Sequence, residues 1–214
     1  PPHPWNVDFP HLMLRAKATR FRRGGTGLAA KILSSTRAVG KLASIPVVVQ
    51  VINAANRNPG ARKLLEKTMG VDAKARVPEY HSPTARKRLR DLDGSGEAVP
   101  AGRTRGKVAL FATCYCDHSD PVVVEDLAVV LQHNAIPTRL VEQESCCGMP
   151  KLELGDLQTV KKYKERNIPV LAKMAREGWD FTTAIPSCVL MFKQELPLMF
   201  PDDADVALVR ERFF

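Results

Sequence analysis

Apolar and polar residues alternate differently in the two halves of the chain. Beyond residue 106, continuous apolar runs of strand length are separated by stretches whose apolar residues recur at helical spacing. The runs at 107–112, 137–142 and 180–186 predict strands, and the stretches at 121–133 and 156–177 predict helices. Because strands that alternate with helices usually form a parallel sheet, we predict an α/β fold for this part of the chain.

The first half has a helical pattern instead. After a proline-rich start that we expect to be extended, apolar residues recur at helical spacing as far as Gly70, with Lys and Arg between them. Residues 76–106 have almost no apolar pattern and are rich in Pro, Gly, Lys and Arg, which is typical of a linker. We therefore predict a basic, mostly helical arm (1–75), a linker (76–106) and an α/β domain (107–214) with a parallel, Rossmann-like sheet and flanking helices.

The charge is divided at nearly the same place. The net charge of +9 is the sum of +14 in residues 1–107 and −5 in residues 108–214. The basic arm fits an anionic membrane surface or a partner protein, and we expect no nucleic acid because no recognition motif accompanies the charge.

Neither a membrane-spanning segment nor a signal peptide is visible in the sequence. No apolar run reaches the roughly 20 residues that a spanning helix needs. We expect a cytoplasmic protein that could lie at the inner face of a membrane. Because the chain begins with Pro1 rather than Met, we also expect it to be part of a longer polypeptide.

All five cysteines lie in the predicted α/β domain, and each follows a predicted strand. They are Cys114 and Cys116 after the first strand, Cys146 and Cys147 after the second, and Cys188 after the third. The carboxyl ends of parallel strands share one edge of a sheet, where α/β folds place their ligands. We therefore predict that the five thiols meet in one metal centre.

Two neighbouring features agree with a metal centre. Gly148 directly follows the vicinal pair and allows either a positive φ or a close approach of the backbone to a bulky group, so we predict that it contacts the cofactor. A helix predicted to begin near Val189 would favour the thiolate of Cys188. His118, by contrast, is expected to face solvent in a loop.

Several chemistries remain open for these thiols. Structural zinc is the main rival, but zinc sites usually draw paired ligands from two short knuckles, whereas a vicinal pair suits a larger cluster with several irons. Buried inert thiols, a disulfide framework and thiol–disulfide exchange are less favoured, the last because vicinal disulfides are strained. The residues alone thus favour an iron–sulfur cluster.

The spacing of Cys114, Cys146-Cys147-Gly148 and Cys188 resembles the CCG domain of the heterodisulfide reductase B chain and its relatives. Further stretches, at 1–18, 40–71, 109–115, 146–157 and 186–201, are similar to iron–sulfur oxidoreductase subunits of the kind found as the C chain of anaerobic glycerol-3-phosphate dehydrogenase. The resemblance spans essentially the whole chain. In that family a ferredoxin-like segment precedes the matching region and a second CCG domain follows it, so both are expected in the full polypeptide.

The resemblance implies a [4Fe–4S] cluster, with a noncubane form as the alternative, held by Cys114, Cys146, Cys147 and Cys188. The most complete family pattern ends in C-x-x-C, and here Met191 takes the last position. We therefore consider Cys116 as a candidate fifth thiolate.

The resemblance also implies a function. The chain would be an electron-transfer subunit without catalytic residues of its own, passing electrons from a flavin-containing dehydrogenase partner to a quinone or another acceptor. The alternative is a metal-stabilised scaffold, holding zinc or no cluster, without a redox role.

Overall fold

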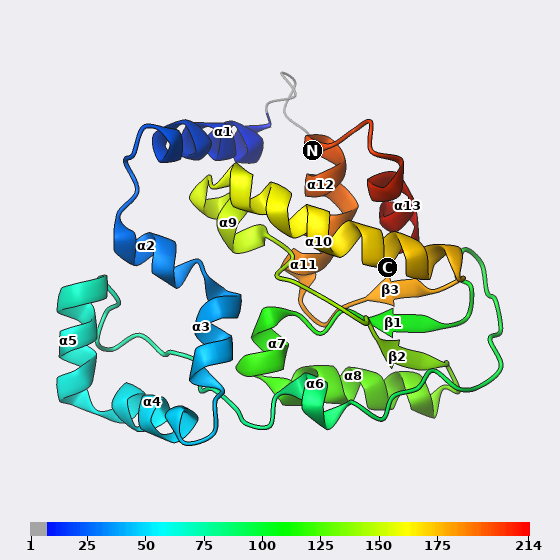
Figure 1. Ribbon diagram of the computed structural model, residues 1–214, viewed down its shortest axis with the longest axis horizontal. Helices are drawn as coiled ribbons and strands as arrows, with labels where there is room; N and C mark the ends of the chain where they lie inside the picture. The colour runs from blue at the N-terminus through cyan, green and yellow to red at the C-terminus, as the bar shows by residue number, and fades with distance from the viewer. Residues whose placement is uncertain (1–7) are drawn as a thin grey trace.

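The computed structural model describes residues 8–214, and the proline-rich start that we expect to be extended lies mostly in residues 1–7, outside them. Five helices form the first third of the described chain, drawn from blue to cyan in Figure 1. They are α1 (Phe9–Arg22), α2 (Leu28–Leu33), α3 (Thr36–Ala43), α4 (Val48–Arg57) and α5 (Pro59–Met69). The prediction of a mostly helical arm is therefore confirmed.

Local sequence signals explain where these helices begin and end. The Asp8 carboxylate caps α1 by accepting a hydrogen bond from the His11 amide. The Asn58 side chain caps α5 by accepting from the Gly60 and Ala61 amides, at 2.9 and 3.0 Å. That helix ends at Gly70, whose φ of 71° lies in the left-handed region that glycine adopts at low cost.

The sheet has three parallel strands in the order β2–β1–β3. They are β1 (Val108–Leu110), β2 (Thr138–Leu140) and β3 (Asp180–Thr182), and Val108 is in register with Thr138 and Asp180. The predicted parallel α/β fold is confirmed, although each strand is shorter than its apolar run. Beyond Phe111 the chain leaves the ladder, because the Ala112 amide donates to the Glu144 carboxylate at 2.9 Å instead of to a strand.

Helices cover both faces of the sheet (Figure 1). On one face lie α8 (Pro121–His133) and the short α6 (Ala85–Arg88). On the other lie α9 (Met149–Leu154), α10 (Leu157–Arg176), α11 (Pro186–Leu190), α12 (Leu196–Met199) and α13 (Ala204–Arg212), with a π-helical turn at Met191–Glu195. The helices predicted at 121–133 and 156–177 match α8 and α10, and Pro169 lies inside α10.

Each face of the sheet has its own core. Ala109 of the central strand and Phe111, which directly follows it, belong to the larger core, which α10 and α13 cover. Leu110 belongs to the smaller core with Val124 and Ala128 of α8. This alternation follows from the two-residue period of a strand. The sheet is thus buried on both sides and can serve as a rigid base for the loops at its edge.

Residues 76–106 lie along the α/β part. Ala85 is fully buried in the smaller core, against which Leu89 and Leu92 pack, and the Arg86 guanidinium donates to the carbonyl oxygen of Val141 at 2.8 Å. The division of the chain into three domains stays a prediction.

None of the helices in residues 8–214 is by itself long and apolar enough to cross a membrane. Within that described range, α3 and α4 meet the criterion when taken together, and they are bent by 108°.

Candidate metal centre

Three loops bring the cysteines to the carboxyl edge of the sheet. Cys114 is the first residue of α7 (Cys114–His118), the helix that follows β1. Cys146 and Cys147 lie in the loop between β2 and α9, and Cys188 lies in the first turn of α11 after β3. The helix that we predict to begin near Val189 therefore starts three residues earlier, at Pro186.

Four of the sulfurs form two close pairs. The Sγ atoms of Cys114 and Cys146 are 3.9 Å apart, and those of Cys147 and Cys188 are 3.1 Å apart. The peptide bond between Cys146 and Cys147 joins the two pairs. Within residues 8–214, no three His, Cys, Asp or Glu side chains already converge tightly enough to hold a single ion. The arrangement is therefore two close thiol pairs carried by adjacent residues, which we call the thiol row.

The side chain of Cys116 points away from the other four thiols. It is fully buried, but in the smaller core on the other face of the sheet, beside Val124 and Ala128. In the described chain its sulfur has no hydrogen bond to another thiol. The cause is the geometry of α7. Side chains two positions apart on an α-helix point about 200° apart around its axis, so those of Cys114 and Cys116 cannot face the same way.

Gly148 and Met191 close the loop of the vicinal pair. Gly148 has a φ of 106°, and a Cβ added there would lie 3.3 Å from Cε of Met191. Met191 is completely buried in the same core as Cys147 and Cys188. Its thioether thus lies against the backbone that carries the vicinal pair, at the place where the family pattern has a further cysteine.

A strained backbone presents Cys114. Thr113 has a φ of 66°, which is uncommon for a β-branched residue and costs about 1–3 kcal/mol. Its hydroxyl accepts a hydrogen bond from the amide of Cys116 at 3.1 Å and so caps α7. The strain places Cys114 on the side of α7 that faces the other thiols.

Burial and neighbouring sulfurs keep the thiols protonated. The hydrogen bond with Cys146, together with burial, raises the pKa of Cys114 far above its usual range. The pKa of Cys146 is lowered by the hydrogen bond with Cys114, but the contact with Cys147 and burial raise it more, to about 11. A metal ligand must be a thiolate, so any metal bound here displaces protons.

The helical arm reaches the sulfurs through α3, which the sequence did not reveal. The hydroxyl of Thr36 lies 3.1 Å from Sγ of Cys114 and 3.9 Å from Sγ of Cys146. The preceding residues are held by Lys151, a buried ammonium that donates to the hydroxyls of Ser34 and Ser35, both at 2.9 Å. A Ser-Ser-Thr run is typical of an ordinary helix start, so it gave no local signal of this contact.

His118 corrects another expectation. It does not face solvent in a loop: it ends α7 and is 4% exposed, with Nδ1 3.1 Å from the hydroxyl of Ser44. Burial lowers its pKa. A Cβ added to Gly40 would lie 2.5 Å from the His118 ring, so glycine allows α3 to pack directly on α7. His118 therefore joins the arm to the helix that carries Cys114.

A large apolar cavity lies between the arm and the cysteine loops. Its volume is about 890 Å³, and its walls include Leu42, Ile52 and Leu65 of the arm. Thr36 of the arm also lines it, and Cys114, Cys147 and Cys188 line it from the other side. Three of the four paired thiols are thus reachable from one apolar space.

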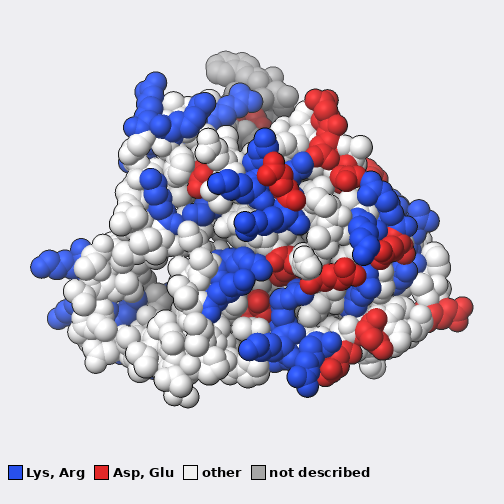
Figure 2. Space-filling model, viewed as in Figure 1, with Lys and Arg blue, Asp and Glu red and all other residues white. Residues whose placement is uncertain are grey.

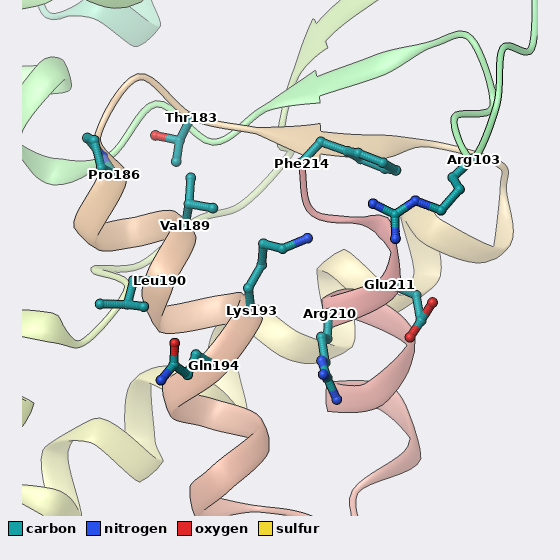
Figure 3. Close-up of a pocket in the computed structure, with 10 residues that line it drawn as sticks. All are labelled: Arg103, Thr183, Pro186, Val189, Leu190, Lys193, Gln194, Arg210, Glu211 and Phe214. Carbon is teal, nitrogen blue, oxygen red and sulfur yellow. The ribbon is translucent and has the colours of Figure 1, made fainter. Parts of the chain in front are cut away.

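A second cavity, of about 900 Å³, lies beside α11 and α13 (Figure 3). Lys193 and Arg103 point toward the Phe214 ring there, with their charged groups 5.6 and 5.8 Å from its centre. None of the five cysteines lines this cavity. The chemistry of the thiols is therefore associated with the first cavity.

The donor set fits an iron–sulfur cluster. Three buried thiols and the half-buried thiol of Cys114 form two close pairs, an apolar core surrounds Cys147 and Cys188, and Gly148 keeps the backbone after the vicinal pair free of a side chain. Cysteine thiolates are the usual ligands of such clusters, and the thiol row suits several irons better than one tetrahedral ion.

Comparison with known proteins agrees with this site. Residues 108–193 match the model of a family described as CCG, a cysteine-rich domain. The chain is homologous to the C chain of the anaerobic glycerol-3-phosphate dehydrogenase of Escherichia coli, with 24% identity over 195 residues, which cover 91% of this chain and 47% of that protein. It is also homologous to the B chain of the fumarate reductase (CoM/CoB) of Methanothermobacter marburgensis, with 28% identity over 129 residues, which cover 59% of this chain and 25% of that protein.

The chain thus spans about half the length, or less, of these curated relatives. No solved structure matches it significantly. The resemblance to CCG-domain oxidoreductase subunits is confirmed.

Proposed function

We propose that this chain, whose residues 108–193 form a CCG domain, is an electron-transfer subunit that holds an iron–sulfur cluster. Its ligands would be Cys114, Cys146, Cys147 and Cys188. The observation that carries the proposal is the two close pairs of thiols at one edge of the sheet, three of which line one apolar cavity. Both relatives are named as subunits of oxidoreductases, which supports a general role in electron transfer.

The chain's own residues would bind and shield the group. When bound, an iron–sulfur cluster exchanges single electrons, and its potential depends on hydrogen bonds to sulfur and on exposure to solvent. The Thr36 hydroxyl can donate to Cys114, and Met191 keeps water from the vicinal pair. We assign no acid–base catalysis on substrate to any residue.

The 890 Å³ cavity is a suitable place for an electron acceptor. Its lining is mostly apolar, and its size is within the range of small-molecule sites. A quinone, which is flat and apolar, would lie against the side of the cavity that Cys114 and Cys188 form. We propose a flavin-containing dehydrogenase subunit as the donor, with a [4Fe–4S] cluster, cubane or noncubane, between donor and acceptor.

We further propose that the arm works at the inner face of a membrane. Leu42, Val47 and Val51 expose 65%, 70% and 64% of their surface, and Figure 2 shows a largely uncharged area over α4 and α5 at the lower left. Basic side chains of α1 border the upper left of the same view. Apolar side chains beside Lys and Arg suit an anionic lipid surface.

Flotation with liposomes of anionic lipid tests the membrane proposal. Replacing Arg15, Arg20, Arg22 and Arg23 by Gln should reduce the bound fraction, because each basic residue near the surface contributes about 1 kcal/mol. Unchanged flotation would contradict membrane docking.

The cluster proposal is tested on the full-length protein purified without oxygen. Iron and acid-labile sulfide analysis with EPR spectroscopy should show a cluster in the wild type. Cys147→Ala should lose most of the iron. Cys116→Ala is the matched control, because it also removes a buried thiol but lies outside the row.

The same experiment decides between the alternatives. Equal iron loss in both variants would favour Cys116 as the fifth ligand that the sequence suggested. Colourless wild-type protein with one zinc per chain would contradict the electron-transfer proposal and favour a metal-stabilised scaffold.

A further inference from the structure

A third cavity, of about 630 Å³, lies beside residues 142–145, the part of the loop that directly precedes Cys146. Four cationic side chains from three different helices line it: Arg37 and Lys41 of α3, Arg86 of α6 and Arg166 of α10. Figure 2 shows basic side chains gathered over the region where α3 approaches α10. Cations from separate elements that face one space repel each other unless an anion lies between them.

Of these four cations, the two carboxylates in the wall pair only with Arg86 among the described residues. Glu142 also lies near Arg139 and Lys173, at 3.6 and 3.9 Å. Glu144 accepts from the amide of Ala112 and lies 3.3 Å from Arg86. Among residues 8–214, neither Arg37, Lys41 nor Arg166 forms an ion pair. The cavity therefore has an excess of positive charge.

Two buried groups at the cavity also lack a hydrogen bond. The hydroxyl of Ser145, in a residue that is 5% exposed, has none within the described chain. Nη1 of Arg86 has none either, although it lies 3.3 Å from the Glu144 carboxylate. A buried polar group without a partner is unfavourable, and an unexplained one indicates a missing ligand. Both groups can donate, and donors are what an oxyanion requires.

We infer that this cavity binds a phosphate-type oxyanion, either inorganic phosphate or the phosphate group of a monoester. Arginine guanidinium groups bind phosphate oxygens with two parallel hydrogen bonds, and Arg37 and Arg166 can supply them from two sides. Nη2 of Arg86 already donates to the carbonyl oxygens of Val141 and Glu142, so Arg86 adds its charge and its Nη1 donor. Ser145 adds a hydroxyl donor. A concave space of this size suits a small molecule.

The site is independent of any metal but adjacent to the thiol row. Arg37 follows Thr36, whose hydroxyl contacts Cys114, and Ser145 precedes Cys146. An anion held here would fix the position of α3 over the sulfurs. The proposal does not rest on the electron-transfer function and can be tested on protein without metal.

Isothermal titration calorimetry on the full-length protein tests the proposal, with inorganic phosphate and with phenyl phosphate at fixed ionic strength. We expect one saturable site per chain. Arg37→Gln and Arg166→Gln should each weaken binding by roughly tenfold or more, because each removes a charged hydrogen-bond donor. Ser145→Ala should weaken it less. Tighter binding of phosphate would indicate the free anion, and tighter binding of phenyl phosphate would indicate an ester.

Lys162→Gln is the matched control, because it removes one exposed positive charge from the same helix as Arg166 without touching the cavity. It should change binding by less than about twofold. Lys41→Gln, at an exposed lining position, keeps the test valid if the Arg37 variant does not fold. Heats that do not saturate, or equal weakening by Lys162→Gln, would overturn the proposal in favour of diffuse attraction to a basic surface.

Discussion

The two halves of the molecule bury apolar residues to very different extents. Phe111, Phe181 and Phe213 of the α/β half are completely buried in one core. The buried apolar residues of the described arm, 8–75, are Ala18, Ala43 and Val49, all small or of medium size. The arm therefore has little core of its own, and its position depends on contacts with the α/β half.

Those contacts are few and specific. Gly40 and Ser44 meet His118, Lys151 holds the start of α3, and the backbone of α1 approaches Gly155. A Cβ added to Gly155 would lie 2.6 Å from backbone atoms of Lys17, so α1 and α9 are in direct contact. Since the same α3 places Thr36 beside the thiols, the arm has little core of its own and yet forms part of the site.

The largest loss of stability is expected from a substitution in the core of the α/β half. Phe181→Ala should lower the free energy of unfolding by about 3–5 kcal/mol, because it leaves a cavity in a closely packed core. Val51→Ala on the arm, at a side chain that is 64% exposed, should change it by less than about 0.5 kcal/mol. Urea denaturation followed by circular dichroism measures both. A comparable loss for Val51→Ala would contradict the view that the arm lacks a core.

A smaller loss of stability is expected where the arm packs on the α/β half. Gly40→Ala should weaken the packing of α3 on α7 by about 1–3 kcal/mol, because the new Cβ overlaps the His118 ring. The usual gain from replacing a helical glycine offsets only about 0.5–1 kcal/mol of this. Hydrogen exchange should become faster in α3 and stay unchanged in β1 and β3.

A double-mutant cycle separates the clash from other causes. His118→Ala removes the ring, so Gly40→Ala should cost nothing more in that background. If the two changes were additive, the contact between Gly40 and His118 would not be what limits the packing of α3.

The sequence alone could predict the sheet and the position of the thiols. Apolar runs before Cys114, Cys146 and Cys188 identified the three strands, and the rule that parallel strands share a carboxyl edge brought the cysteines together. This worked because both signals are local: each depends on residues within one strand and its following loop.

Contacts between distant parts of the chain could not be predicted in this way. Thr36 and Cys114 are 78 residues apart, and Ser34 and Lys151 are 117 apart, with no local pattern that pairs them. The direction of Cys116 depends on α7 beginning at Cys114, whereas a loop was expected there. His118 was placed in solvent for the same reason, since its polar neighbours suggested a surface.

The contact of the arm with the thiols predicts a change in redox potential. Thr36→Val removes a hydroxyl that can donate to Cys114 and keeps the shape of the side chain. Such a hydrogen bond stabilises the reduced cluster, whose sulfurs are more negative, more than the oxidised one. Losing it, at a cost of about 1 kcal/mol, should therefore lower the midpoint potential of a bound cluster by roughly 40 mV. Thr19→Val on α1 is the matched control. Potentiometric titration followed by EPR should show no shift for the control, and an equal shift in both would exclude a local cause.

The smallest effect is expected at the other end of the arm, where His11 joins α1 to the α/β half. Its Nδ1 lies 2.5 Å from Asp8 and its Nε2 lies 3.2 Å from Glu195. The hydrogen bond with Asp8 and the charge of Glu195 raise the pKa of His11, although burial opposes them.

A raised folded-state pKa of His11 stabilises the docking of α1 below the ordinary pKa of about 6.5, and this stabilisation is lost as the pH rises through the folded-state pKa. Protection factors of α1 amides should thus be lower at pH 8 than at pH 6, and His11→Gln should remove that difference while the Lys17–Glu153 ion pair remains in place. The same pH dependence in the variant would show that another group controls the docking of α1.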